Sequence, residues 1–283
     1  MSELTSLLGL GESARLVIMT ADDLGLCHAA NTGVAEAMDR GLVTSASILM
    51  PAPWSKEAAV TYRGGDVGVS LAITAEHELL RFGPITHAPS LLGGDGGFAS
   101  SVTDALDHAD LDEVRRECRA QLERAILMGF DVTHLASHHS ALVTRPEFFD
   151  IVLELAVEYQ LPLRLVSGPL ASNLGFPARD LAREAGVVVP DRFIDTTGIG
   201  LRNGLERVLE DLDDGVTEIV VHPASDTEEL RAFAADADQR IDDLRLLTRE
   251  ASIKALLRDQ GATLIGWRPL RELARRSAPS IGW

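Results

Sequence analysis

Apolar strand-like runs alternate with amphipathic helical stretches from Arg15 almost to the end of this sequence. The first run, residues 16–21, is continuously apolar and includes β-branched residues, a pattern typical of a parallel strand buried on both faces. The clearest helical stretch, residues 110–128, has apolar residues at helical spacing opposite a charged face. Such alternation predicts a mainly parallel sheet with right-handed crossover connections. The chain is therefore expected to belong to the α/β class.

The same two patterns predict the remaining elements. We expect further strands at residues 45–50, 67–74, 132–137, 163–166, 187–189, 218–222 and 263–267. We expect further helices at residues 31–40, 54–62, 148–159, 178–185, 201–212 and 239–258. About seven strand–helix units favour a TIM-like (β/α) barrel, distorted or incomplete, over an open doubly wound sheet. Because no repeat or linker divides the sequence, residues 1–283 are expected to form one domain.

Residues 76–109 contain no clear strand or helix pattern, and four glycines lie close together within them. Irregular segments of this length are uncommon in compact domains and are usually functional, for example as lids. We therefore expect a functional loop here.

Charge and composition exclude several classes of partner. The formal net charge of −17 argues against nucleic acids and anionic membranes, because the field of the protein repels phosphate groups. No segment approaches the roughly 20 apolar residues of a membrane-spanning helix, and the first residues lack the features of a signal peptide. The two cysteines, Cys27 and Cys118, lie far apart. We expect a reduced, cytoplasmic protein that acts on a small molecule or an oligosaccharide, with a homodimer as a candidate assembly.

Two adjacent carboxylates, Asp22 and Asp23, directly follow the first predicted strand. Carboxylates at the end of a buried strand repel each other and lose hydration, so the fold must compensate for them. A divalent metal ion does so when one carboxylate is its ligand and the other acts as a base. Alternatively, Asp22 caps the next helix and Asp23 is solvated. This segment alone does not distinguish the two interpretations.

Histidines gather at the ends of other predicted strands. Four of the eight histidines lie there, namely His77, His138, His139 and His222. In a (β/α) barrel the carboxyl ends of the strands meet at the rim that carries the active site. One such histidine is more often a structural core residue, but several at one rim, together with the aspartates, favour a metal or acid–base site. The set suits Zn²⁺, or Mg²⁺ with more water ligands, and such ions promote hydrolysis of amides and esters.

His138 and His139 are neighbours, and neighbouring side chains on a regular strand point to opposite faces. We therefore expect His138 to face the site and His139 to point away from it. His134 is spaced to share the face of His138 but to lie deeper in the barrel.

Taken together, several segments resemble the YdjC-like carbohydrate deacetylase family, which includes the ChbG-type chitooligosaccharide deacetylases. The segments are, in order, Thr20-Ala-Asp-Asp-Leu-Gly25, Gly41-Leu-Val-Thr-Ser-Ala-Ser47, Asp66-Val-Gly-Val69, Thr133-His-Leu-Ala-Ser-His138 and Val221-His-Pro-Ala224. The resemblance covers roughly residues 15–270. It implies a distorted (β/α) barrel and a metal-dependent hydrolase that removes N-acetyl groups from amino sugars or small N-acetylated oligosaccharides.

By position within these segments, the resemblance also implies a role for four residues. Asp22 would be the general base, and Asp23 and His138 would be metal ligands. His222 would be the general acid that protonates the leaving amine, or would orient it. Attack by water on the amide carbonyl is assisted when a base takes the proton and a cation stabilises the oxyanion.

One position departs from the family pattern. Ser70 stands where members usually have the histidine of a Gly-x-His-Leu segment, which is the third metal ligand. A serine hydroxyl reaches less far than an imidazole and is a poor ligand for Zn²⁺. Three outcomes are open: the ion binds more weakly, His77 or His139 takes the vacant place, or the metal is absent. Ala136, where a carboxylate is common, removes further polarity.

Two other functions remain open. The chain could be a lyase or isomerase that uses Asp22 and His222 without a metal. It could also be a sugar-binding relative that does not turn its ligand over.

Overall fold

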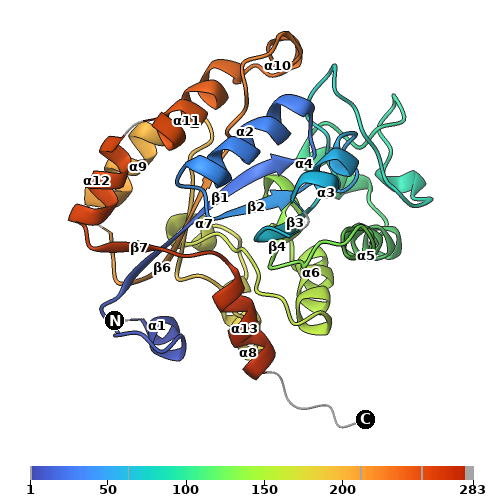
Figure 1. The fold of residues 1–283 in the computed structure, drawn as a ribbon. Helices are drawn as coiled ribbons and strands as arrows, with labels where there is room; N and C mark the ends of the chain where they lie inside the picture. The colour runs from blue at the N-terminus through green and yellow to red at the C-terminus, as the bar shows by residue number, and fades with distance from the viewer. Residues whose placement is uncertain (1, 63, 211, 250, 278–283) are drawn as a thin grey trace.

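The computed structural model describes residues 2–62, 64–210, 212–249 and 251–277. Within them, one seven-stranded sheet has the order β4-β3-β2-β1-β6-β5, and β7 also pairs with β1. The strands are β1 (Arg15–Leu24), β2 (Ser45–Ile48), β3 (Val67–Leu71), β4 (Leu135–Ser137), β5 (Arg192–Asp195), β6 (Gly215–Val221) and β7 (Ala262–Leu264). Every pairing is parallel, and the sheet curls into an incomplete barrel surrounded by helices (Figure 1). The predicted fold class is confirmed.

The gap between the two ends of the strand order is spanned by extended but irregular chain. Leu135 donates to the carbonyl of Pro162, and Leu163 donates to the carbonyl of Val188, each at 2.9 Å. Leu135 and Leu163 form only an isolated bridge and neither segment forms a ladder, so the predictions of strands at 163–166 and 187–189 are wrong, and the strand β5 was missed. Pro162 and Pro190 explain the difference, because proline has no N–H to donate to a ladder.

Helices cover the outside of the sheet. The longer ones are α2 (His28–Arg40), α3 (Ser55–Tyr62), α5 (Leu111–Leu127), α6 (Pro146–Glu158), α9 (Leu201–Glu210), α11 (Ala237–Arg249), α12 (Ala251–Asp259) and α13 (Arg268–Ser277). The shorter ones are α1 (Glu3–Leu7), α4 (Val102–His108), α7 (Gly168–Ser172), α8 (Ala178–Glu184) and α10 (Glu228–Phe233). The predicted helices are confirmed except that 239–258 is divided into two, and residues 211 and 250 of the predicted spans lie outside the described residues.

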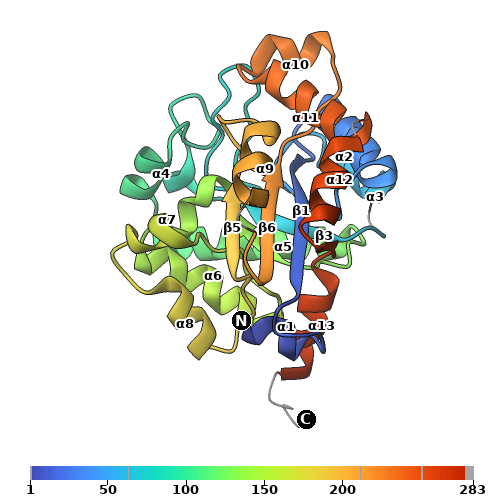
Figure 2. The ribbon, with the colours of Figure 1, turned by 90° about the vertical axis from the view of Figure 1, so that its left-hand side faces the viewer.

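The predicted irregular segment also contains some helix. It includes α4 and a single 3-10 turn, Pro89–Leu91, between extended stretches. This segment and α10 lie beyond the carboxyl ends of the strands, while α1 and α13 lie at the opposite end (Figure 2).

The side chains inside the barrel change from apolar to polar toward the carboxyl ends of the strands. At the base, Leu16 and Ile18 of β1 pack in one small cluster with Trp267. The next inward residue, Thr20, donates to Glu218 at 2.8 Å and accepts a hydrogen bond from the Trp267 indole at 3.2 Å. Because side chains alternate along a strand, Asp22 follows Thr20 on this inward face. The base of the barrel is therefore a packed core, and the polar site lies at the mouth.

A buried histidine belongs to the same polar layer. His134, on the predicted inward face, is fully buried, stacks on Trp267 with ring centroids 4.4 Å apart, and lies 3.0 Å from the Ser47 hydroxyl. Gly68 makes room for it, because a Cβ at this position would lie 2.3 Å from the ring nitrogen Nδ1.

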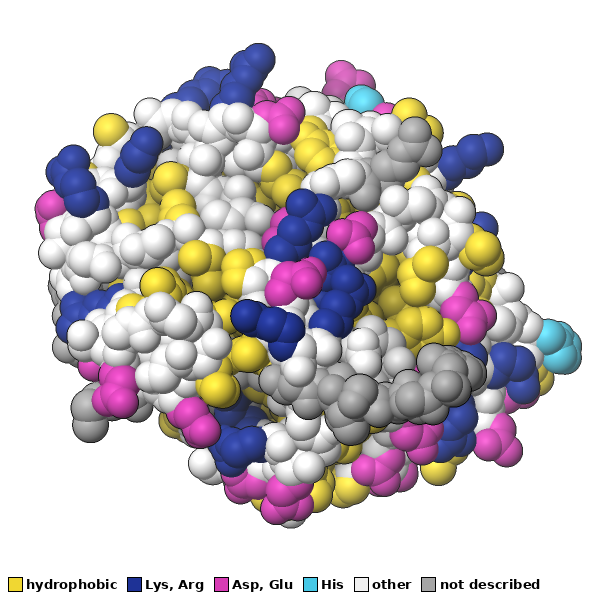
Figure 3. Space-filling view, turned by 60° about the horizontal axis from the view of Figure 1, so that its bottom comes forward, with side chains coloured by type: hydrophobic (Ala, Val, Ile, Leu, Met, Phe, Trp, Pro, Cys, Tyr) yellow, Lys and Arg dark blue, Asp and Glu magenta, His cyan; other side chains and the backbone are white. Residues whose placement is uncertain are grey.

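One face of the outer surface mixes charges of both signs. Figure 3, which brings the lower side of Figure 1 forward, shows basic and acidic side chains intermingled, with histidine seen only near the margins. Among the described residues, no helix combines the length and apolar character needed to cross a bilayer.

Candidate active site

A backbone irregularity places both predicted aspartates at the mouth of the barrel. The register between β1 and β2 shifts between Ala21 and Leu24, and Asp23 has a left-handed φ of 65°. Such a bulge interrupts the alternation of side chains, and aspartate tolerates the left-handed conformation better than most residues. As a result, Asp22 and Asp23 both line a cavity of about 100 Å³. The interpretation of Asp23 as a solvated residue is wrong, because only 4% of it is exposed.

Asp22 is held by a buried arginine. Arg164 donates to both of its carboxylate oxygens, at 2.6 and 2.9 Å. The same guanidinium donates to Glu218 at 2.7 and 3.0 Å, and Glu218 is fully buried. Burial raises the pKa of Glu218 above its usual value, although the charge of Arg164 opposes this shift. Arg164 therefore links a carboxylate of the cavity to one in the barrel interior.

Asp23 is paired with a second arginine, Arg240, whose Nη1 lies 2.7 Å from Oδ2 of Asp23. Burial favours the neutral acid, but Arg240, together with His222 and His138, holds the pKa of Asp23 well below its ordinary range. Asp23 is thus a buried, ionised carboxylate whose charge is already partly compensated.

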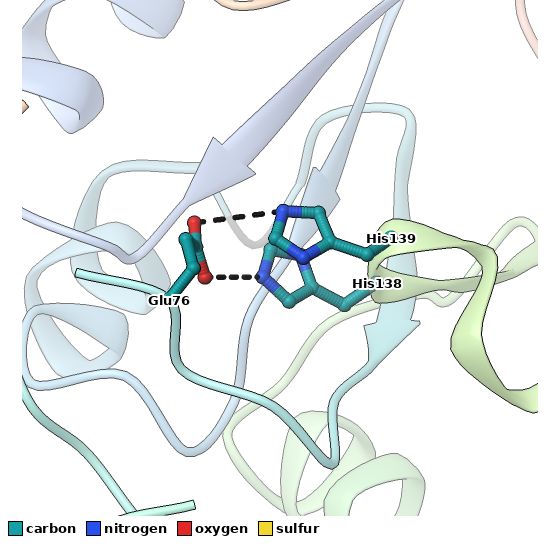
Figure 4. Close-up of side chains that lie close together, drawn as sticks. All are labelled: Glu76, His138 and His139. Carbon is teal, nitrogen blue, oxygen red and sulfur yellow. Dashed lines mark hydrogen bonds and ion pairs between the residues drawn. The ribbon is translucent and has the colours of Figure 1, made fainter. Parts of the chain in front are cut away.

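Two histidines and a glutamate form the most compact cluster of metal-ligand types in the described structure (Figure 4). Glu76 lies 3.1 Å from His138 Nε2 and 3.6 Å from His139 Nε2, and the two imidazole rings stack at 4.1 Å. His139 does not point away from the site as expected. It and Ser140 have left-handed φ values of 51° and 55°, so the chain has left the regular strand and alternation no longer applies.

The charges in this cluster influence one another. Although burial opposes it, the hydrogen bond and charge of His138 lower the pKa of Glu76 to about 2. Burial also opposes protonation of His138, but Glu76 and Asp23 raise its pKa above the usual value. Burial and the neighbouring His138 lower the pKa of His139.

This cluster fits a divalent cation. One potential ligand atom from each of the three residues lies within 4.8 Å of the other two, so a single ion can contact all three. Imidazole nitrogen and carboxylate oxygen are ligands that Zn²⁺ accepts, and Mg²⁺ prefers the oxygen. His77 lies beside the cluster, with its Nε2 atom 3.2 Å from Glu76 Oε1.

Ser70 lies below this cluster in the barrel. It pairs in register with Ala136, and the preceding inward residue of β3 is Gly68, which contacts His134. Alternation therefore places Ser70 on the inward face, where it is buried at 2% exposure.

The structure brings most of the predicted site together. The residues that line the cavity include Asp22, Asp23, His138, His139 and His222. Of the other two candidates, His77 contacts Glu76, and Ser70 lies in β3 as described above.

Sequence reasoning assigned no role to Glu76, Arg164 or Arg240. Glu76 stands beside His77 at a predicted strand end, which was a usable signal. Arg164 interrupts an apolar run, and a buried arginine implies carboxylate partners. Arg240 had no such signal, because it lies on an amphipathic helix whose charged residues are usually solvated.

The fold and this cavity define an α/β barrel protein with a candidate metal centre at the carboxyl ends of its strands. A family model described as YdjC-like protein matches residues 16–259, and the chain therefore belongs to the YdjC-like family. The resemblance found in the sequence is confirmed.

Individual relatives agree with this assignment. A carbohydrate deacetylase from Thermoanaerobacter pseudethanolicus is 30% identical over 261 residues, which cover 91% of this chain and 100% of the relative. A carbohydrate deacetylase from Thermus thermophilus is 35% identical over 238 residues, covering 82% of this chain and 85% of the relative. A crystal structure from Enterococcus faecalis, described as a candidate for cellobiose-phosphate cleavage, superposes with a TM-score of 0.79 at 26% identity and covers 91% of this chain and 99% of its own.

Proposed function

We propose that this protein is a metal-dependent carbohydrate deacetylase that hydrolyses the N-acetyl amide of an amino sugar or small N-acetylated oligosaccharide. The observation that carries the proposal is the cluster of Glu76, His138 and His139 beside a cavity lined by Asp22 and His222. The similarity of the chain to proteins named carbohydrate deacetylases supports this substrate class.

Glu76, His138 and His139 would hold the divalent ion, Zn²⁺ or Mg²⁺, with Asp23 as the ligand implied by family position. When bound, such an ion supplies Lewis acidity toward the acyl oxygen and promotes attack by water. Ser70 cannot act as an imidazole ligand. In this proposal Glu76 and His139 therefore coordinate the ion in place of the histidine that family members usually have at position 70. His77 lies beside Glu76, with its Nε2 atom 3.2 Å from Glu76 Oε1.

The remaining steps use side chains of the cavity. Asp22, oriented by the two bonds from Arg164, takes a proton from the attacking water. Water oxygen bonds to the amide carbon, and the carbon–nitrogen bond then breaks. His222 gives a proton to the departing nitrogen, so the products are acetate and the free amino sugar.

Metal content and acetate release test the two parts of the proposal separately. The wild-type protein should bind a divalent ion near one equivalent and release acetate from N-acetylglucosamine oligomers. Glu76→Gln should reduce the bound metal strongly, because an amide is a weaker ligand than a carboxylate. The exposed neighbour Glu78 offers a matched control, and Glu78→Gln should keep both metal and activity. Equal metal content in Glu76→Gln and wild type would contradict the proposed ligand set.

Asp22→Asn tests the proposed general base independently of metal binding. The variant should retain its metal and lose acetate release, because asparagine cannot accept the proton. Normal turnover by this variant would exclude Asp22 as the base.

Ser70→His tests the vacant family position. A rise in metal affinity would show that an imidazole at this position reaches the same ion. An unchanged affinity is expected if Glu76 already occupies that ligand position.

A second candidate function follows from the pairing of Asp23 with Arg240. A carboxylate compensated by an arginine is less available to a metal, which favours a sugar-binding relative without turnover. Binding of N-acetylglucosamine oligomers with neither metal nor acetate release would support that alternative.

A further inference from the structure

One wall of the cavity has no role in the mechanism above. It is formed by Phe193 and Asp195 of β5 and by Thr197, which follows the strand. Phe193 and Asp195 are two residues apart, so alternation places both side chains on the same face of β5. An aromatic ring and a carboxylate therefore stand side by side at the edge of the cavity.

The backbone and the ring of Phe193 each have a fixed partner. Ser167 Oγ accepts a hydrogen bond from the backbone N–H of Phe193 at 2.9 Å and donates to its carbonyl at 3.3 Å. The guanidinium carbon of Arg164 lies 5.7 Å from the ring centroid, within the range of a cation–π contact. Because Arg164 also holds Asp22, the ring has a fixed position relative to the proposed base.

The carboxylate is prepared to accept further hydrogen bonds. The backbone N–H and the hydroxyl of Thr197 donate to Oδ1 of Asp195, at 2.9 and 2.6 Å. Asp195 is exposed, and among the described residues both of these donors reach the same oxygen. The side chain is therefore oriented, and within the described part of the chain no such donor reaches its Oδ2 atom.

The size of the cavity indicates which part of a ligand meets this wall. A volume of about 100 Å³ corresponds to a few water molecules. It accommodates an acetamido group but not a whole pyranose ring, so the ring of a bound amino sugar must remain at the rim. There it meets Phe193, which is half-buried, and the exposed Asp195.

We propose that Phe193 and Asp195 bind the sugar ring that carries the scissile acetamide and thereby determine specificity for a pyranoside. The inference rests on the proposed function for the identity of that acetamide. A pyranose has an apolar C–H face, which matches the face of an aromatic ring, and hydroxyl groups, which a carboxylate accepts through charge-assisted hydrogen bonds. A site built to pair with hydroxyls discriminates against ligands that lack them.

Direct binding and kinetics of Phe193 variants test this inference. Phe193→Leu preserves most of the apolar volume and removes only the flat ring, and Phe193→Tyr keeps the ring. For N,N′-diacetylchitobiose, Phe193→Leu should raise both Kd and KM about tenfold, as expected for loss of roughly 1.4 kcal/mol of contact. Its kcat should change much less, because the contact acts on binding, and Phe193→Tyr should stay close to wild type.

Asp195→Asn should also raise Kd, by about fivefold, because a neutral acceptor forms weaker hydrogen bonds. Ile194, on the other face of β5 by alternation, provides a matched control, and Ile194→Val should bind the sugar as the wild type does. Unchanged sugar affinity in Phe193→Leu and Asp195→Asn would overturn the inference.

The two proposals fail in different ways. If the wild type releases no acetate, the proposed function fails. Titration of the sugar into wild type and Phe193→Leu then still tests whether Phe193 binds the sugar ring. If acetate release is normal and both variants bind the sugar normally, only the inference fails.

Discussion

Replacing Arg164 by methionine tests whether the polar interior of the barrel depends on one cation. Methionine preserves much of the length of the side chain but removes the guanidinium that donates to both Asp22 and Glu218. Glu218 is fully buried, and Arg164 itself is 6% exposed. Removing one partner of a buried ion pair leaves an uncompensated charge and costs about 3–5 kcal/mol. We expect Arg164→Met to lower the free energy of unfolding at pH 8 by an amount in this range.

The loss should depend on pH in a defined direction. Burial already raises the pKa of Glu218, and Arg164 opposes that rise, so the folded variant should hold the proton even more strongly. A carboxyl group whose folded pKa exceeds its unfolded value destabilises the fold increasingly as pH rises above about 4.3. The deficit of Arg164→Met should therefore be smaller at pH 5 than at pH 8.

Urea unfolding at the two pH values measures both effects. The double variant Arg164→Met/Glu218→Gln is the matched control, because glutamine is neutral and its carbonyl can still accept the hydrogen bond from Thr20. It should recover most of the stability lost at pH 8. A deficit below about 1 kcal/mol in the single variant, or one that does not change with pH, would refute this account of the interior.

Three further predictions concern other parts of the fold. Gly68→Ala should lower the free energy of unfolding by about 1–3 kcal/mol through overpacking against the His134 ring, which calorimetry can measure, and an unchanged midpoint would contradict the close contact. Burial raises the pKa of Asp243 to about 6, so ionisation of this carboxylate destabilises the fold increasingly as pH rises from about 3.9, its unfolded pKa, to the folded value. Asp243→Asn should therefore stabilise the protein more at pH 8 than at pH 5, by about 1.4 kcal/mol, and an equal effect at both values would be inconsistent with the raised pKa. Asp110 accepts two backbone N–H bonds at the start of α5, so Asp110→Ala should cost about 1 kcal/mol in urea unfolding, whereas Asp110→Asn should cost less.

The fold could be predicted where the spacing of apolar residues in a segment matches the burial of that segment in the barrel. The run at residues 16–21 is buried on both faces of β1, and residues 111–127 form an amphipathic helix with Asp110 as its cap. The segments at 163–166 and 187–189 were harder, because prolines flank them and their pairing is limited to isolated contacts. β5 was missed because Arg192 and Asp195 flank only two apolar residues.

The members of the site could be predicted better than their orientation. The positions of Asp22, Asp23, His138 and His222 at strand ends follow from the topology of a parallel barrel. The inward turn of His139 does not, because it depends on left-handed backbone angles that a rule of alternation cannot include.

The residues that pair with the site residues could not be predicted in this way. Arg164 and Glu76 approach the cavity from segments distant in sequence, and such pairings depend on tertiary packing alone. The pairing of Arg240 with Asp23 joins residues 217 positions apart.

The left-handed backbone at Asp23 and His139 has a consequence for how this mouth can be altered, by evolution or in the laboratory. Alanine at either place would disturb the main chain together with the chemistry, so a loss of function could not be attributed to the missing side chain. Asparagine is among the few residues that tolerate these angles, and it removes the charge or the imidazole while preserving the turn. Saturation libraries at these two sites should therefore be dominated by survivors with small polar side chains or glycine, whatever reaction is selected.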